Sequence, residues 1–394
     1  MIRSLETRQG NSNAKIRGVN LGGWFVLEPW ITPSIFSSGN GVVDEYTYTK
    51  SLGKQKASSA LKNHWSKWIT QSDFSAIAGA GLTHVRIPIG YWAIAPRDED
   101  PYVQGQLSYL DQAIQWARGA GLKVQVDLHG APESQNGFDN SGKFGKVGWQ
   151  SGNTVKETLD ALDGLADRYK GDTDVVTAIE LLNEPLGPEL DLDGVESFYK
   201  SGIQTVKSKS QNYAVAISDA FQDFSTYWQG KFTGQNVILD THQYQIFTPE
   251  EVGRSPSEHV KHACEKVGAK LASNDKTVIV GEWTAAQTDC AKWLNGLGKG
   301  ARYDGTFQGP QGGSNYVGSC EGKDTGSASG LSSDDKKNLR SYVEAQLDAY
   351  EQGGGWYFWT WKTESAPEWN LKDLLANDLF PQPLNSRQYQ GQCS

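Results

Sequence analysis

The sequence predicts a single-domain (β/α)8 TIM barrel with extended loops at the C-terminal face of its strands. Eight short apolar runs recur along the 394 residues, and most of them are followed by a stretch with helical periodicity. Near-continuous apolar runs rich in β-branched residues are typical of parallel strands that are buried on both faces. Repeated alternation of such strands with helices is typical of this barrel.

The predicted strands, in chain order, are residues 17–21, 83–87, 123–128, 176–183, 213–218, 237–241, 277–282 and 356–361. Helical periodicity between them predicts helices over residues 107–120, 154–169, 195–209, 256–271 and 333–351. In the first of these, Leu107, Leu110 and Ile114 fall on one face, and Gly121 follows as a stop signal. The crossover between the fifth and sixth strands is short, and its helix is poorly marked. Ser218 and Asp219, at the end of the fifth strand, are expected to cap a helix, and an approach to the site is the alternative.

The chain shows no interdomain linker and no long repeat, so residues 1–394 are expected to form one catalytic domain. Residues 1–14 are expected to be an irregular N-terminal extension. The glycine-rich segments 309–313 and 322–330 are typical of surface loops inserted near the last two strand–helix units.

Composition narrows the possible partners. The net charge of -9 disfavours nucleic acid, which normally binds a basic face. Charged residues make up 21% and hydrophobic residues 37%, and no apolar stretch approaches the roughly 18–20 residues of a membrane-spanning helix. The chain has 14 Trp, 16 Tyr and 13 Phe, and aromatic faces stack on the apolar faces of sugar rings. These features favour a neutral carbohydrate ligand.

The four cysteines are Cys264, Cys290, Cys320 and Cys393, and three pairings are open to them. They contain no CxxC spacing, which argues against a zinc site. An even number without metal spacing points to an oxidising compartment. The first residues lack the apolar core of a signal peptide, which fits either a cytosolic chain or a mature form with an added start methionine.

Polar and aromatic residues stand where the predicted strands end. If the runs form one barrel, these ends share a single mouth, where barrel enzymes carry their active sites. The residues at the strand ends are Arg86, Asp127, His129, Asn183, Glu184, His242, Tyr244, Glu282 and Trp361. The sequence therefore predicts a site at this mouth.

Two of these strand-end residues, Glu184 and Glu282, predict glycoside hydrolysis. One carboxylic acid must protonate the leaving oxygen, while one carboxylate attacks the anomeric carbon. Two neighbouring carboxyl groups can take these two roles. The charge of the ionised group raises the pKa of the other, which therefore stays protonated. Arg86 or Tyr244 is expected to donate a hydrogen bond that keeps Glu282 ionised and oriented toward the anomeric carbon.

Other features of the sequence are compatible with other functions. His259 and His262 are spaced i, i+3 on a predicted helix, but no carboxylate or thiol completes a metal site, so we expect exposed polar residues and no bound metal. An endo-acting cellulase or mannanase on the same barrel is the rival enzyme. The alternative from another functional class is a glucan-binding wall protein with an inactive site. The presence of both glutamates argues against it.

The motifs themselves resemble a known family. The segments LLNEP around Glu184 and VGEW around Glu282 are similar to the two glutamate motifs of glycoside hydrolase family 5. Longer segments resemble the fungal exo-β-1,3-glucanases of that family, from about residue 15 to the C-terminus: RGVNLGGWFVLEPWITPSIF, VVDEYTYTKSLGK, VRIPIGYW, DLHGAPESQNGFDNSG, THQYQIF, GEWTAAQTDCAKWLNG and WYFWTWKTESAPEW. The glycine-rich segment between residues 303 and 334 departs from the family pattern.

The resemblance implies a retaining exo-acting hydrolase with Glu184 as acid/base and Glu282 as nucleophile. It implies that β-glucose is released from the non-reducing end of β-1,3-glucans, with some action on β-1,6 linkages and aryl β-glucosides and with transglycosylation. It implies a glucose pocket formed by Glu28, Arg86, His129, Asn140, Asn183, His242, Tyr244 and Trp361. We expect Glu28, Asp139 and Asn140 to close one side of it.

The resemblance further implies an aromatic clamp on the second sugar, made by Phe138 and Phe247. It implies the disulfides Cys264–Cys393 and Cys290–Cys320, and a secreted or cell-wall protein whose signal peptide has been removed. No cofactor, nucleic acid or membrane partner is expected. The expected partner is a β-glucan or β-glucoside substrate, and the expected state is a monomer.

Overall fold

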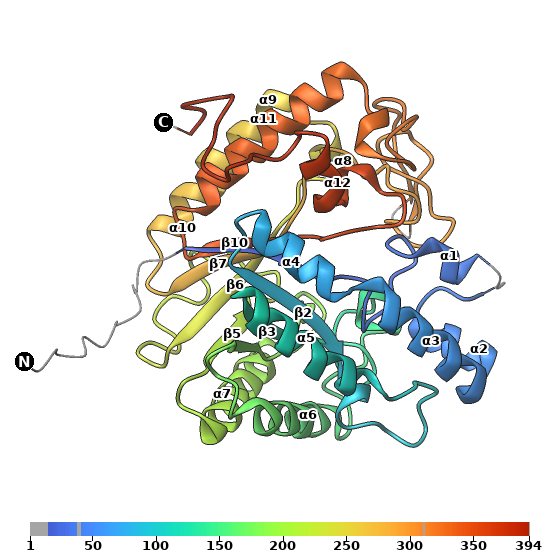
Figure 1. Ribbon diagram of the computed structural model, residues 1–394, viewed down its shortest axis with the longest axis vertical. Coiled ribbons are helices and arrows are strands. Elements are labelled where there is room, and N and C mark those ends of the chain that lie inside the picture. The colour runs from blue at the N-terminus through green and yellow to red at the C-terminus, as the bar shows by residue number, and fades with distance from the viewer. Residues whose placement is uncertain (1–14, 38–40, 310–311, 394) are drawn as a thin grey trace, which may run out of the picture.

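The computed structural model describes residues 15–37, 41–309 and 312–393, and eight parallel strands in this part of the chain close into a barrel (Figure 1). The barrel strands are β1 (Ile16–Asn20), β2 (His84–Gly90), β3 (Lys123–Gly130), β4 (Val176–Glu180), β5 (Ala214–Ser218), β6 (Val237–Gln243), β7 (Thr277–Trp283) and β10 (Gly355–Phe358). Each pairs with its neighbours in chain order, and β1 closes on β10 with Arg17 opposite Trp356. The predicted fold class is confirmed. The expected extension over residues 1–14 lies outside the described residues.

Helices surround the barrel, with α6 and α7 on one side and α9 and α11 on the opposite side (Figure 1). Their bounds are α1 (Pro33–Phe36), α2 (Glu45–Leu52), α3 (Lys54–Trp68), α4 (Gln71–Gly79), α5 (Gln106–Ala120), α6 (Thr154–Tyr169), α7 (Leu192–Lys209), α8 (Pro249–Val252), α9 (Pro256–His262), α10 (Ala269–Ala272), α11 (Ser333–Tyr350) and α12 (Leu371–Ala376). The helix predicted over 256–271 is divided by a π-helical segment, Ala263–Gly268. The other four predicted helices are present with small shifts of their ends.

The segment between β5 and β6, residues 219–236, contains turns and no regular helix. The expectation that Asp219 caps a helix is therefore wrong. Its carboxylate instead accepts a hydrogen bond from the backbone of Phe221 at 2.9 Å and another from the hydroxyl of Thr241 at 2.6 Å. These bonds fix a tight loop beside the mouth of the barrel.

The register between β6 and β7 is irregular near the mouth. Thr241 lies opposite Val280, but His242 lies opposite Glu282, so Gly281 is an extra residue in β7. Such a bulge changes the direction in which the following side chains point. Here it places His242 and Glu282 side by side at the end of their strands.

Apolar side chains fill the space between barrel and helices. On α6, a stripe of buried residues (Ala161, Leu162, Leu165, Ala166) packs inward. His259 on α9 is also buried, 1% exposed, with its ring 5.5 Å from that of Tyr342 on α11. The expectation of an exposed His259 is wrong because α9 packs against α11 at this face.

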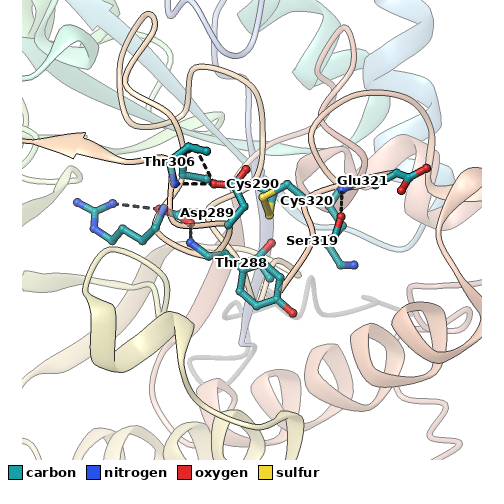
Figure 2. Close-up of a disulfide and its surroundings, with 12 residues drawn as sticks. Thr288, Asp289, Cys290, Thr306, Ser319, Cys320 and Glu321 are labelled. Atoms are coloured by element: carbon teal, nitrogen blue, oxygen red, sulfur yellow. Dashed lines mark hydrogen bonds and ion pairs between the residues drawn. A yellow bond between two sulfur atoms is a disulfide. The ribbon is translucent and has the colours of Figure 1, made fainter. Parts of the chain in front are cut away.

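Both disulfides implied by the resemblance are present. Cys264–Cys393 joins the π-helical segment to the C-terminus, and Cys290–Cys320 closes a loop after β7. Figure 2 shows the second bond next to Asp289, whose carboxylate accepts hydrogen bonds from the backbone of Arg302 at 2.7 Å and Tyr303 at 3.0 Å. The closed loop contains two short strands that pair antiparallel, β8 (Gln308–Gly309) and β9 (Gly312–Gly313). Among the described residues, no helix has the length and apolar character needed to span a membrane.

Candidate active site

Two glutamates face one another across the mouth of the barrel. Glu184 lies just beyond β4 and Glu282 lies near the end of β7, and a carboxylate oxygen of one is within 4.8 Å of a carboxylate oxygen of the other. They are 8% and 4% exposed. Carboxyl groups about 5–5.5 Å apart are typical of retaining glycosidases, and groups about 6.5–9.5 Å apart are typical of inverting ones. The short separation fits direct attack by one carboxylate.

Glu282 is held by a donor on each oxygen. Arg86 Nη1 donates to Oε1 at 2.9 Å, and the hydroxyl of Tyr244 donates to Oε2 at 2.7 Å. Burial raises the pKa of Glu282 above its ordinary value, against the opposing charges of His242 and Arg86. The two donors aim the carboxylate and stabilise its charged form, as a nucleophile requires.

Glu184 is held by His242 and Asn140. His242 Nδ1 is 2.7 Å from Glu184 Oε1, and Asn140 Nδ2 donates to Oε2 at 3.2 Å. Burial raises the pKa of Glu184, but the hydrogen bond and charge of His242 outweigh it, so the pKa lies below its ordinary value. For His242, burial lowers the pKa, but the charges of Glu282 and Glu184 outweigh it and raise the pKa to about 10. Both shifts favour a charged His242, whose Nδ1 lies 2.7 Å from Glu184 and 3.5 Å from Glu282.

Arg86 lies beneath the pocket rather than on its wall. Its side chain is fully buried on β2, where Nε donates to Glu180 at 2.7 Å and Nη2 donates to Asn183 Oδ1 at 2.8 Å. Nη2 also lies 3.2 Å from a carboxylate oxygen of Asp127. With its further bonds to Glu282 and Asn20, one guanidinium ties five side chains together and fixes the floor of the site.

Several buried polar atoms of the floor have no hydrogen-bond partner among the described residues, and two of them are nitrogens on Asn183 and His129. These are the side-chain nitrogen of Asn183 and Nε2 of His129. His129 is oriented by Asp127, whose oxygen lies 2.5 Å from Nδ1, and its ring stacks on Trp359 at 5.5 Å. Buried polar atoms normally have partners, so both atoms are suited to sugar hydroxyls.

The structure turns Trp361 away from the glutamate pair, and Trp359 is the tryptophan that stacks on His129. β10 ends at Phe358, three residues before Trp361. The indole of Trp361 turns toward α4 and donates to Asp73 at 2.9 Å, buried in the main apolar core. The apolar run alone does not show where the strand stops, and this error follows from counting it as strand to its last residue.

Two further carboxyl groups, those of Glu28 and Asp139, lie near the pair of glutamates. Glu28 accepts a hydrogen bond from the indole of Trp30 at 2.9 Å. Burial, with the nearby charge of Asp139 as a second cause, raises the pKa of Glu28 well above its ordinary value. Burial and the charge of Asp44 raise the pKa of Asp139 to about 7. Groups that change easily between donor and acceptor suit the hydroxyls of a sugar.

Three phenylalanines stand on the rim. Phe138 is 40% exposed and Phe247 is 39% exposed, and the ring of Phe247 meets that of Tyr244 edge-to-face with centroids 5.5 Å apart. Phe221 is 46% exposed and meets Phe138 edge-to-face with centroids 6.4 Å apart, and no sequence feature singled it out. A groove beside these rings is lined by Glu184, Asp219, Phe221, Gln222, Asp223, Phe224, His242, Gln243 and Lys270.

Sequence reasoning also missed Asn20, Glu180 and Asp240, which are buried around Arg86 and Gly281. Their signal was visible: each is a polar residue inside or at the end of an otherwise apolar run. A charge in a buried strand is costly unless it is paired, so it marks a network rather than an ordinary surface residue.

Two groups of side chains have spacings that a metal ion would accept: Glu180, Asp240 and His242, and Glu184, His242 and Glu282. A cation at either group would lie beside the guanidinium of Arg86 and the protonated ring of His242. Both positive charges already neutralise these carboxylates. The donor set is therefore better suited to acid–base and nucleophilic chemistry than to a metal.

Comparison with known proteins gives consistent matches. Residues 48–299 match the family described as "Cellulase (glycosyl hydrolase family 5)". A protein of Blumeria graminis named "Glucan 1,3-beta-glucosidase" is 58% identical over 389 residues, covering 97% of this chain and 90% of the relative. A "Probable glucan 1,3-beta-glucosidase A" of Aspergillus niger is 54% identical over 381 residues, covering 96% of this chain and 90% of the relative.

Solved structures support the fold. The crystal structure of AoRut has a TM-score of 0.72 at 21% identity and covers 93% of this chain and 96% of its own. The rutinosidase from Aspergillus niger has a TM-score of 0.69 at 20% identity, covering 93% and 97%.

Proposed function

The chain belongs to glycosyl hydrolase family 5, and we propose that it is a retaining, exo-acting enzyme that releases β-glucose from the non-reducing end of β-1,3-glucans. The observation that carries this proposal is the Glu184–Glu282 pair, with carboxylate oxygens within 4.8 Å in a buried pocket. The names of the relatives at 58% and 54% identity support the linkage.

The reaction is a double displacement. Glu282 attacks the anomeric carbon while Glu184 gives its proton to the leaving glycosidic oxygen, which forms a glucosyl ester on Glu282. Glu184 then removes a proton from a water molecule, the water attacks the same carbon, and the ester bond breaks. Each displacement inverts the configuration at the anomeric carbon, so the released glucose has the same configuration as the substrate. His242 Nδ1, 2.7 Å from Glu184, is the nearest group that can place a proton on the acid before the first step.

The pocket holds one terminal glucose. Its hydroxyls meet Glu28, Asp139 and Asn140 on the closed side and the free atoms of His129 and Asn183 on the floor. Trp359, stacked on His129, supplies an apolar wall. An endo-acting enzyme would need the closed side open, so this enclosure favours release of single glucose units.

The second glucose lies between Phe138 and Phe247. An aromatic face has no directional hydrogen bond to satisfy, so it accepts a β-1,3-linked or β-1,6-linked sugar or an aryl group. Burying part of each ring contributes about 1–2 kcal/mol at roughly 25 cal/mol per Å2. The same rim holds a sugar acceptor, which competes with water and gives transglycosylation.

We further propose that the whole chain forms one catalytic domain that acts as a secreted or cell-wall monomer on β-glucan. The two disulfides support an oxidising compartment. The net charge of -9 suits a neutral polysaccharide better than a polyanion.

Product analysis on laminarin tests the proposal. Glucose should appear first, and NMR of the fresh product should show the β-anomer. Oligosaccharides as first products would mean endo-acting cleavage, and the α-anomer would mean inversion. No product from laminarin, together with none from an aryl β-glucoside, would mean a binding protein.

A further inference from the structure

Gly281, directly before Glu282, is an extra residue in β7 and lacks a ladder partner on β6. Its two backbone groups are taken up by side chains instead. The backbone N–H donates to Asp240 Oδ1 at 2.7 Å, and the carbonyl accepts from Asn20 Nδ2 at 2.8 Å. Asn20 and Asp240 are 0% and 1% exposed, so water does not compete for these bonds. Unpaired backbone groups at a buried bulge would otherwise be costly.

No side chain fits at position 281. A Cβ there would lie 2.1 Å from both carboxylate oxygens of Asp240, so this carboxyl group occupies the space that a side chain would fill. Asp240 and Gly281 are therefore matched to each other. Asn20 extends the arrangement, because its Oδ1 accepts a hydrogen bond at 3.0 Å from the same Arg86 Nη1 that donates to Glu282.

We infer that Asp240 and Asn20 are positioning residues that clasp the peptide groups of Gly281 and thereby aim the carboxylate of Glu282 at the anomeric carbon. The inference rests on the proposed role of Glu282 as nucleophile. The two hydrogen bonds to Gly281, from its N–H to Asp240 and to its carbonyl from Asn20, are called the clasp below. Without them the bulge is free to relax, and Glu282 turns away from Arg86. A displacement of about 1 Å of a reacting group lowers the rate on the order of 100-fold.

The clasp requires an acceptor on Asp240 rather than a negative charge. Burial raises the pKa of Asp240 well above its ordinary value and Glu180 adds to the rise, while His242 and Arg86 oppose it. The backbone N–H of Gly281 donates to a single oxygen, Oδ1 of Asp240, and the amide oxygen of an asparagine can accept the same hydrogen bond. Asp240→Asn should therefore preserve the clasp, whereas Asp240→Ala should remove it.

The first experiment measures formation of the covalent intermediate with 2-deoxy-2-fluoro-β-glucosyl fluoride, at saturation and by intact mass. Asp240→Ala should slow labelling on the order of 100-fold while the concentration for half-saturation changes less than about threefold. Asp240→Asn should stay within about fivefold of the unmodified protein. Normal labelling of Asp240→Ala, or equally slow labelling of Asp240→Asn, would overturn the inference.

The second experiment separates aiming from packing. Gly281→Ala alone should lower Tm and slow labelling, because of the clash with Asp240. Adding Asp240→Gly should relieve the clash and restore much of the Tm, but labelling should stay slow, because the N–H is still unclasped. If labelling recovers together with Tm, the pair serves packing only and the inference fails.

Glu344 provides a matched control. This buried carboxylate also accepts backbone N–H groups, those of Gln388 at 3.0 Å and Tyr389 at 2.7 Å, but on α11. Glu344→Ala should lower Tm and leave the labelling rate of the folded protein unchanged. Peptide mapping of the unmodified protein tests the premise separately: a label on a residue other than Glu282 would overturn the nucleophile assignment and the clasp with it.

Discussion

The floor and the rim of the site are built in different ways. On the floor, Arg86, Asn20 and Asp240 are at most 1% exposed, and hydrogen bonds between neighbouring strands fix them. On the rim, Phe138 and Phe221 lie on loops and are 40% and 46% exposed. In the proposed function, the floor holds Glu282, which reacts with the substrate, and the rim only contacts the substrate.

This difference has a physical reason. Chemistry requires reacting atoms to be held within a fraction of an ångström, which barrel strands in register provide and loops do not. Selection of a second sugar tolerates looser placement, because stacking on an aromatic ring is only weakly directional. We therefore expect changes on the floor to act on the rate of chemistry and changes on the rim to act on substrate preference.

The largest effect is expected for Glu282→Gln. The amide keeps the shape of the side chain but cannot attack the anomeric carbon, so turnover should fall by at least about 10⁴-fold. Binding of laminaribiose, measured by calorimetry, should remain. Residual turnover close to that of the unmodified protein would remove Glu282 as the nucleophile.

Glu184→Ala should affect substrates unequally. Loss of proton donation should lower the rate on laminaribiose by about 10²–10⁴-fold and on a glucoside with an acidic phenol much less. Azide should restore part of the second activity and yield β-glucosyl azide, detected by NMR. An equal loss on both substrates without rescue would contradict the acid/base assignment.

The dependence of Tm on pH should show the coupling between the charge of His242 and the carboxylates around it. The pKa of His242 is about 10 in the folded protein, against about 6.5 in an unfolded chain. Its protonation therefore stabilises the fold fully below about pH 6.5, and this contribution is lost as the pH rises toward 10. His242→Gln should reduce the decline of Tm over this window, measured by calorimetry. Phe138→Ala on the rim should leave the slope unchanged, and parallel Tm curves for His242→Gln and the unmodified protein would contradict the coupling.

The smallest effect is expected on the rim. Phe138→Ala should lower kcat/KM on laminaribiose about tenfold, in line with about 1–2 kcal/mol per ring, and change kcat/KM on a small aryl glucoside little. Tm should stay nearly constant, because the ring is 40% exposed. Leu52→Ala on α2, where Leu52 is 37% exposed, is a control that should change neither activity. Equal losses on both substrates would contradict a clamp.

The sequence by itself determined the architecture and the position of both glutamates. Parallel strands buried on two faces leave a continuous apolar run, and this signal is local along the chain. All eight runs contain a strand, and Glu184 and Glu282 follow directly from where two of them end. The family resemblance added the cysteine pairing, which spacing alone left open among three possibilities.

Only the tertiary structure decided how the site is held together. Which tryptophan lies beside His129, Trp359 or Trp361, depends on where β10 stops pairing with its neighbours. The hydrophobicity of the run does not show that position. The contacts of Arg86 with Glu180 and Asn20 span 94 and 66 positions in sequence. The place of Gly281 depends on a bulge between two strands. Such features depend on register and on the meeting of distant side chains, because hydrogen bonds are set by geometry in space and not by the order of residues along the chain.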